Sequence, residues 1–179
     1  MEIEAGFQGR EDAIVDLFTE TFATSEGPEE GALIGNLVQD LLGQTPAADI
    51  RVFRAVDGDL LIAAVVFTRL TYPEDTRYVV LLSPMAVGTG FQRQGVGQAV
   101  IRHALATLRS EGAELAITYG DPEYYRRVGF HPINEVQIQP PLPLSVPRGW
   151  IGQSLTGGEM PILAGKPKCV PAMNRADVW

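Results

Sequence analysis

Two segments with the composition of buried strands flank one predicted helix, and this order constrains the fold more than any other feature of the chain. Residues 78–87 and 114–119 are rich in Val, Leu, Ile and Ala, while residues 95–109 carry apolar side chains at helical spacing. A strand, a helix and a second strand of this length form a right-handed unit with parallel strands. The sequence therefore predicts an α/β chain with a central, twisted, mixed sheet flanked by helices.

The remaining segments add strands on one side of this unit and a proline-rich region on the other. Eight of the 13 prolines lie at or after Pro132, which argues against regular helix there. We expect a single domain over residues 1–179, with a core of about 1–131 and an extension of about 132–179 packed on the same domain. The other predicted elements are strands at 2–5, 50–56, 60–70, 136–138 and 161–163, helices at 11–22 and 32–42, and a short helical turn ending at Tyr125.

Composition and charge exclude several classes of function. The formal net charge of −8 argues against a nucleic-acid partner, and the single cysteine with two histidines argues against a structural metal site. No apolar run approaches the roughly 20 residues of a membrane span, and the acidic start lacks the features of a signal peptide. We therefore expect a cytoplasmic protein with no membrane partner. Nine carboxylates among residues 1–30 suit a cationic substrate better than an anionic one.

The most informative motif places two glycines and an arginine at the start of the predicted helix. It comprises Gln92, Arg93, Gln94, Gly95, Val96, Gly97 and Gln98. A dinucleotide fingerprint fits less well, because Val100 replaces its third glycine, and a P-loop lacks its Gly-Lys-Ser or Gly-Lys-Thr. A helix start that binds no ligand is the third alternative. Gly97 would then destabilise the first helical turn relative to alanine without any gain in binding. Glycines that admit an anion to free backbone N–H groups predict a phosphate site.

Residues 92–97 match the Gln/Arg-x-x-Gly-x-Gly/Ala signature, so the chain resembles the GCN5-related N-acetyltransferases, the GNAT superfamily. Residues 124–130, Tyr-Tyr-Arg-Arg-Val-Gly-Phe, resemble the terminal motif of that family, in which a tyrosine precedes a Gly-Phe pair by four residues. The segment from Gly120 to Tyr125 and the proline-rich tail are similar to the YhbS-like subgroup. The matching motifs span residues 79–132.

The resemblance implies an acyl-CoA N-acyltransferase fold and direct transfer of an acetyl group from acetyl-CoA to a primary amine, without a metal. It implies that residues 92–98 bind the pyrophosphate and that Met85, Ala86 and Val87 hold the pantetheine arm between the strands ending near Val87 and Tyr119. Pro84 fits the break in strand pairing that such binding needs, because proline donates no ladder hydrogen bond. The resemblance assigns Tyr125 the role of general acid. It also suggests a homodimer and a small-molecule or peptide acceptor.

The chain departs from the family pattern in its general base. Residues 78–83 contain no carboxylate where many relatives have a glutamate, and Gly120-Asp121 stands where an asparagine is common. Ser83, acting through a water, and Asp121 are the candidates for the base. Two alternatives stay open at this point: an acyl-CoA sensor or interaction module without turnover, and a nicotinamide-nucleotide enzyme.

Overall fold

The computed structural model describes residues 1–179, which form two compact units that alternate along the chain. Unit 1 comprises Met1–Phe67 and Pro84–Ala104, and unit 2 comprises Thr68–Ser83 and Leu105–Trp179. The chain passes between the units inside two strands and one helix. The prediction of a single domain with a core of about 1–131 stays a prediction.

Seven strands form one mixed sheet in the order β1-β2-β3-β4-β5-β7-β6. The strands β4 and β5 are parallel, whereas β1 with β2, β5 with β7, and β6 with β7 are antiparallel. The predicted fold class is therefore confirmed. The strands are β1 Glu2–Ala5, β2 Ile50–Asp57, β3 Leu60–Leu70, β4 Val79–Val87, β5 Leu115–Tyr119, β6 His131–Pro132 and β7 Trp150–Ser154.

The helices agree with the apolar periodicity of the sequence. They are α1 Glu11–Glu26, α2 Pro28–Gln44, α3 Val96–Ser110 and α4 Pro122–Tyr125, with 3-10 turns at Ala47–Asp49, Thr89–Phe91, Arg126–Val128, Pro147–Gly149, Pro171–Met173 and Ala176–Val178. None of these helices combines the length and the apolar character that a membrane crossing requires.

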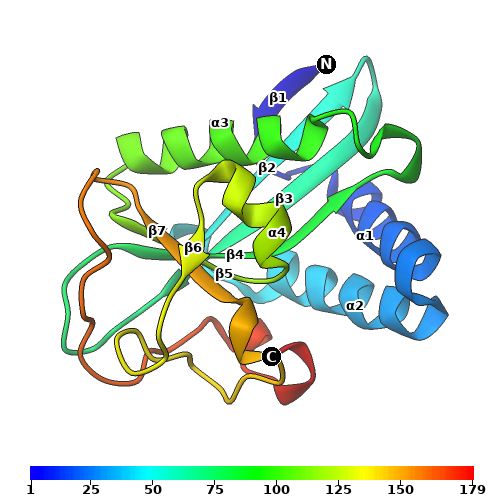
Figure 1. Cartoon of the computed structure of the whole chain (residues 1–179). Helices are drawn as coiled ribbons and strands as arrows, with labels where there is room; N and C mark the ends of the chain where they lie inside the picture. Colours follow the sequence, from blue (N-terminus) through cyan, green and yellow to red (C-terminus); the bar gives the residue numbers. More distant parts are fainter. The chain divides into compact units, whose positions relative to one another are not determined.

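In unit 1, α1 and α2 form a helical hairpin that breaks at Gly27, whose φ of +103° suits glycine. Gly31 and Gly35 of α2 face Ala23 and Thr19 of α1 so closely that an added Cβ would collide with them. Figure 1 shows this hairpin on one side of β2 and β3, with α3 running along the other side. The close approach of α1 and α2 therefore depends on these two small residues.

In unit 2, β4 and β5 pair in parallel: Val79 lies opposite Leu115 at one end of the pairing, and Leu82 lies opposite Thr118 at the other. The pairing ends two residues before Pro84, as expected for a residue that donates no ladder hydrogen bond. The fully buried Trp150 of β7 donates from Nε1 to the Ile138 carbonyl at 2.8 Å. The segment after Pro132 therefore supplies both a strand and a core side chain to unit 2.

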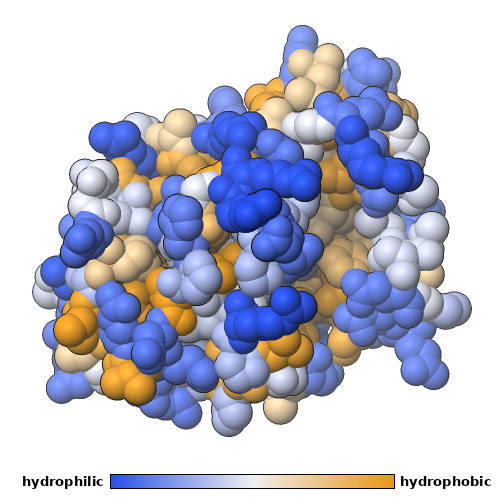
Figure 2. Space-filling model, in the orientation of Figure 1, coloured by the Kyte–Doolittle hydropathy of each residue, from blue (hydrophilic) through white to orange (hydrophobic).

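Two strands predicted in that segment are wrong. Residues 136–138 form a turn instead, because the Asn134 side chain accepts from Val136 N–H and its carbonyl accepts from Ile138 N–H. Residues 161–163 do not pair with a strand: Leu163 N–H donates to the Gln137 carbonyl at 3.0 Å, and Gln137 Nε2 donates to the Pro161 carbonyl at 3.3 Å. Val136 and Ile162 are exposed, and Figure 2 shows hydrophobic atoms at the lower left, over the C-terminal loops.

Candidate active site

In unit 1, the segment before α3 has a backbone suited to binding an anion. Arg93 has a φ of +60° and Gly95 a φ of +81°, so two left-handed residues stand just before the helix. The first intrahelical hydrogen bond of α3 runs from Ala99 N–H to the Gly95 carbonyl. The N–H groups of residues 96–98 therefore precede the helical ladder and point out of the positive end of the helix dipole.

The two glutamines of the motif hold this segment together. Gln92 Nε2 donates to the Val87 carbonyl at 3.0 Å, and Gln94 Nε2 donates to the Gly90 carbonyl at 3.0 Å. These bonds tie the loop to the end of β4 and to the turn that follows it. Both side chains therefore brace the backbone, a role that the sequence motif alone does not reveal.

The positive φ values give the motif a conformational requirement. A Cβ at Gly95 would meet no protein atom within 4 Å, so its conformation, and not crowding, explains the glycine. Arg93 is the only non-glycine residue with a positive φ, and a non-glycine residue in this region costs about 1–3 kcal/mol. A strained, exposed arginine beside free N–H groups is the arrangement expected of a phosphate site, so the residues present fit the pyrophosphate of coenzyme A.

The end of β4 contributes the other residues predicted to bind the cofactor. Ala86 is buried, while Met85 and Val87 are half-buried. The Val87 carbonyl already accepts from Gln92, and Gly88 N–H donates to the Ile62 carbonyl at 2.8 Å. The structure thus joins Val87 and the glycine motif within unit 1, and the contact with pantetheine stays a prediction.

In unit 2, Tyr125 ends the short helix α4 and is held by aromatic neighbours. Its ring packs edge-on against Phe130 at 5.6 Å and against Tyr124 at 5.1 Å between centroids. The other side of the ring lies against Gly120, where a Cβ would stand 2.7 Å from the Tyr125 Cε2. The ring therefore has one defined position, which explains why Gly120 lacks a side chain.

The environment of Tyr125 keeps its hydroxyl protonated. Burial raises the pKa of Tyr125 well above its usual range, the nearby Tyr124 and Asp121 add to this rise, and a hydrogen bond with Thr118 opposes it. Thr118 also donates to the Leu82 carbonyl at 2.8 Å. Sequence reasoning missed Thr118, although a hydroxyl inside an apolar strand is a signal that such a group has a partner. A neutral phenol can act as an acid but not as a base at neutral pH.

The two candidate bases have different surroundings. Asp121 caps the N-terminus of α4, and its Oδ1 accepts from Glu123 N–H at 3.0 Å. Ser83 is half-buried near the middle of β4. Capping α4 gives Asp121 a structural role. The cap uses only one of its two carboxylate oxygens.

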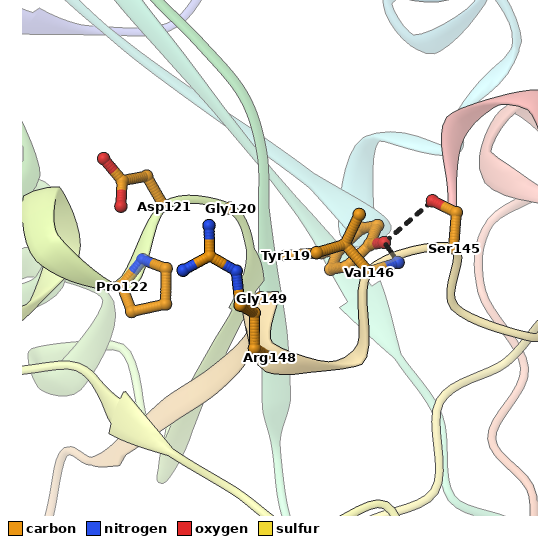
Figure 3. Close-up of a pocket in the computed structure, with 8 residues that line it drawn as sticks. All are labelled: Tyr119, Gly120, Asp121, Pro122, Ser145, Val146, Arg148 and Gly149. Carbon is orange, nitrogen blue, oxygen red and sulfur yellow. Dashed lines mark hydrogen bonds between the residues drawn. The ribbon is translucent and has the colours of Figure 1, made fainter.

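A pocket of about 340 Å³ opens at the end of β5 in unit 2. Figure 3 shows the residues that line it. The charged side chains of Asp121 and Arg148 lie on one side, and the ring of Tyr119 lies on the opposite side. The remaining residues around the pocket are Gly120, Pro122, Ser145, Val146 and Gly149. Sequence reasoning identified only Asp121 among them, because the lining comes from two segments that are more than 20 residues apart.

Comparisons with known proteins show the family of the chain. The sequence model of the acetyltransferase (GNAT) family matches residues 12–130. The N-acetyltransferase YjhQ of Escherichia coli strain K12 is 29% identical over 146 residues, which cover 79% of this chain and 78% of that protein.

Two solved structures share the fold at lower identity. The acetyltransferase YhbS from Escherichia coli, in complex with CoA, has a TM-score of 0.80 at 21% identity and covers 98% of this chain and 92% of that chain. A GNAT acetyltransferase from Brucella melitensis, in complex with acetyl-CoA, has a TM-score of 0.67 at 21% identity, covering 91% and 94%. The predicted family, fold and enzyme class are confirmed: the chain belongs to the acetyltransferase (GNAT) family.

Proposed function

We propose that this protein transfers the acetyl group of acetyl-CoA directly to a primary amine, without a metal and without a covalent enzyme intermediate. The observation that carries the proposal is the backbone of residues 93–98, where two left-handed residues precede the free N–H groups of α3. These N–H groups would bind the pyrophosphate, with Arg93 adding a charge-assisted contact. Met85, Ala86 and Val87 would hold the pantetheine arm.

The transfer follows a simple balance of bonds and protons. The amine nitrogen attacks the thioester carbonyl carbon, a C–N bond forms, and the C–S bond breaks. An ammonium loses two protons on the way to the amide, one to the base before attack and one as the amide forms. The departing thiolate takes one proton from the Tyr125 hydroxyl, so the products are the amide, coenzyme A and one released proton.

Tyr125 suits the role of the acid because its phenol is neutral and its ring is fixed. A phenol and a thiol have ordinary pKa values of about 10 and about 8.5, so proton transfer between them is feasible in a shielded site. Burial raises the pKa of Tyr125 further, which keeps its proton in place at neutral pH and also makes the phenol a weaker acid toward the thiolate. We expect the tyrosinate to regain its proton from solvent after each turnover.

Asp121 is the better of the two candidates for the base, because it is the only one with a carboxylate. Ser83 would act through a water molecule. The variant Asp121→Asn keeps the oxygen that caps α4 and removes only the charge. We expect it to lower kcat/KM at pH 7, with the loss shrinking as the pH approaches the pKa of the acceptor amine, where the free amine needs no base. A purely structural role of Asp121 would leave this loss independent of pH.

Release of coenzyme A from acetyl-CoA in the presence of an amine panel tests the proposal. The panel holds amino acids, peptides, polyamines and aminoglycosides. Tyr125→Phe should lower kcat at least about 100-fold without changing the affinity for acetyl-CoA. Tyr78→Phe is the matched control, because it removes a hydroxyl from another tyrosine of unit 2 and keeps the ring that Arg69 contacts.

The second candidate is an acyl-CoA sensor of the same fold, which the lack of a carboxylate in residues 79–83 favours. Binding of acetyl-CoA without release of coenzyme A by any amine, in the wild type and in Tyr125→Phe alike, would support the sensor.

A further inference from the structure

The pocket at the end of β5 carries one positive and one negative side chain on its rim. We infer that it binds the acceptor and that this acceptor is a small zwitterion, with a carboxylate for Arg148 and an amine for Asp121. The inference rests on the proposed function and narrows its acceptor from any primary amine to an amino-acid-like molecule.

Arg148 is the group that points to a carboxylate. Its guanidinium makes no ion pair and no hydrogen bond, although the chain carries 22 acidic residues against 14 basic ones. Figure 3 shows it extending past Gly120 toward the side of the pocket where Asp121 lies. A guanidinium binds a carboxylate through two parallel hydrogen bonds, and it presents these donors free in this pocket.

The loop that carries Arg148 is fixed in place. The Tyr119 hydroxyl accepts from Val146 N–H at 2.6 Å and shares a hydrogen bond with Ser145 Oγ at 3.0 Å. Gly149 N–H donates to the Val146 carbonyl at 2.9 Å, so the turn closes on itself. A charged group on such a braced loop costs less ordering when it binds a ligand.

The loop also meets the end of β5 through its backbone. Gly120 N–H donates to the Gly149 carbonyl at 3.0 Å, and a Cβ at Gly149 would stand 3.0 Å from the Gly120 carbonyl oxygen. Two glycines thus let the two segments touch. These backbone contacts therefore fix the two segments. Asp121 directly follows Gly120 in one segment, and Arg148 directly precedes Gly149 in the other.

Charge and size together select the ligand class. Asp121 has one carboxylate oxygen that its helix cap leaves available, which suits an ammonium group. Tyr119, Pro122 and Val146 add apolar surface between the two charges. A volume of about 340 Å³ lies at the small end of ligand pockets, so it fits an amino acid better than an aminoglycoside. A polycation would also place positive charge against Arg148.

The pocket adjoins the proposed acid. Gly120 lines the pocket, and the Tyr125 ring packs against the α-carbon of the same residue. Asp121 is also close enough to Tyr125 to act on it through its charge, so an amine held by Asp121 would lie near the residue that protonates the leaving thiolate, as direct transfer requires.

Acceptors that share one side chain and differ only at the carboxylate test the inference. Each set contains an amino acid, its carboxamide and the amine that lacks the carboxylate. Release of coenzyme A is measured for each with wild type, Arg148→Met and Arg148→Lys, and Arg109→Met is the control for loss of an exposed arginine on α3. The amino acid should exceed its carboxamide at least about tenfold in kcat/KM. Arg148→Met should remove this preference by raising KM for the amino acid alone, and Arg148→Lys should keep part of it.

The outcomes separate this inference from the proposed function. Turnover of amines with equal kcat/KM for acid and carboxamide, or an equal effect of Arg148→Met on both, would overturn the zwitterion while the transferase stands. Absence of turnover with every amine would overturn the proposed function instead. In that case, calorimetry decides the inference by itself: the amino acid and its carboxamide are each titrated into the protein in the presence of coenzyme A. Tighter binding of the amino acid, abolished by Arg148→Met, supports the inference. Equal binding of the two ligands overturns it.

Discussion

The Tyr125 ring lies directly on the α-carbon of Gly120, with 2.7 Å between the Tyr125 Cε2 and the position of a Cβ on Gly120. Real Cβ contacts are longer, so any side chain at this position must displace the ring or the strand end. Gly120→Ala should therefore lower kcat strongly, about tenfold or more, and reduce stability by about 1–3 kcal/mol, while the affinity for acetyl-CoA stays the same. Steady-state kinetics and urea unfolding measure these effects.

Gly158→Ala is the control for this substitution. Gly158 also belongs to unit 2, and a Cβ there would meet no atom within 4 Å. It should leave both kcat and stability nearly unchanged. Full activity of Gly120→Ala would show that the position of the Tyr125 ring is not important for transfer.

Alkaline unfolding tests the environment of Tyr125. Burial raises the pKa of Tyr125 in the folded protein, while an unfolded tyrosine titrates near pH 10. The stability that the neutral phenol contributes is thus fully present below about pH 10 and is lost as the pH rises toward the folded pKa, because only the unfolded chain releases its proton there. Urea unfolding from pH 8 to pH 11 should show a stability that falls above pH 10.

The matching variant isolates the contribution of this tyrosine. Tyr125→Phe should make the decline above pH 10 shallower. Part of the decline should remain, because burial also raises the pKa of Tyr72, whose hydroxyl donates to the Gln139 carbonyl at 2.7 Å. Identical slopes for wild type and Tyr125→Phe would contradict the raised pKa.

The segment of residues 92–98, which we propose binds the pyrophosphate, offers a test of backbone conformation. Gly95 has a φ of +81°, and a Cβ there meets no protein atom. Gly95→Ala should therefore cost about 1–2 kcal/mol of stability through strain alone. It should also weaken the binding of acetyl-CoA by about tenfold, as measured by calorimetry, because the N–H groups of α3 lose their alignment.

Gly90→Ala is the matched control on the same segment. Gly90 is exposed, lacks a positive φ and has no neighbour within 4 Å of its added Cβ. It should leave the affinity for acetyl-CoA unchanged. Equal affinities of Gly95→Ala and wild type would argue that the left-handed backbone does not form the phosphate site.

The sequence predicted the elements whose signals are local. The bounds of β1 and β3 are as predicted. For β3 the signals are the short hairpin turn at residues 57–59 and the apolar, β-branched run that follows it, and both lie within a few residues. The helix predicted after the glycine motif is also present, as α3 beginning at Val96. What the motif did not show is the left-handed φ of Arg93, since arginine has no preference for that conformation.

The features that were missed depend on contacts between distant segments. The strand β7, Trp-Ile-Gly-Gln-Ser, has too few apolar residues to be recognised from its sequence alone. It forms because it pairs with β5, with Ser154 opposite Leu115 and Trp150 opposite Tyr119. The pocket with Asp121 and Arg148 likewise needs β5 and the loop before β7 to meet. Such pairings are long-range, and local propensity carries little information about them.

The helical hairpin of unit 1 allows a paired test of two glycines within one helix. An added Cβ at Gly35 would collide with the Thr19 side chain of α1, whereas an added Cβ at Gly43 would meet nothing within 4 Å. Gly35→Ala should therefore destabilise the protein by about 1–3 kcal/mol, because α1 and α2 must separate. Gly43→Ala should stabilise it by up to about 1 kcal/mol, since alanine is the better helix former. Urea unfolding measures both, and the double variant Gly35→Ala with Thr19→Ala should recover part of the loss if the Thr19 side chain is what the new methyl group meets.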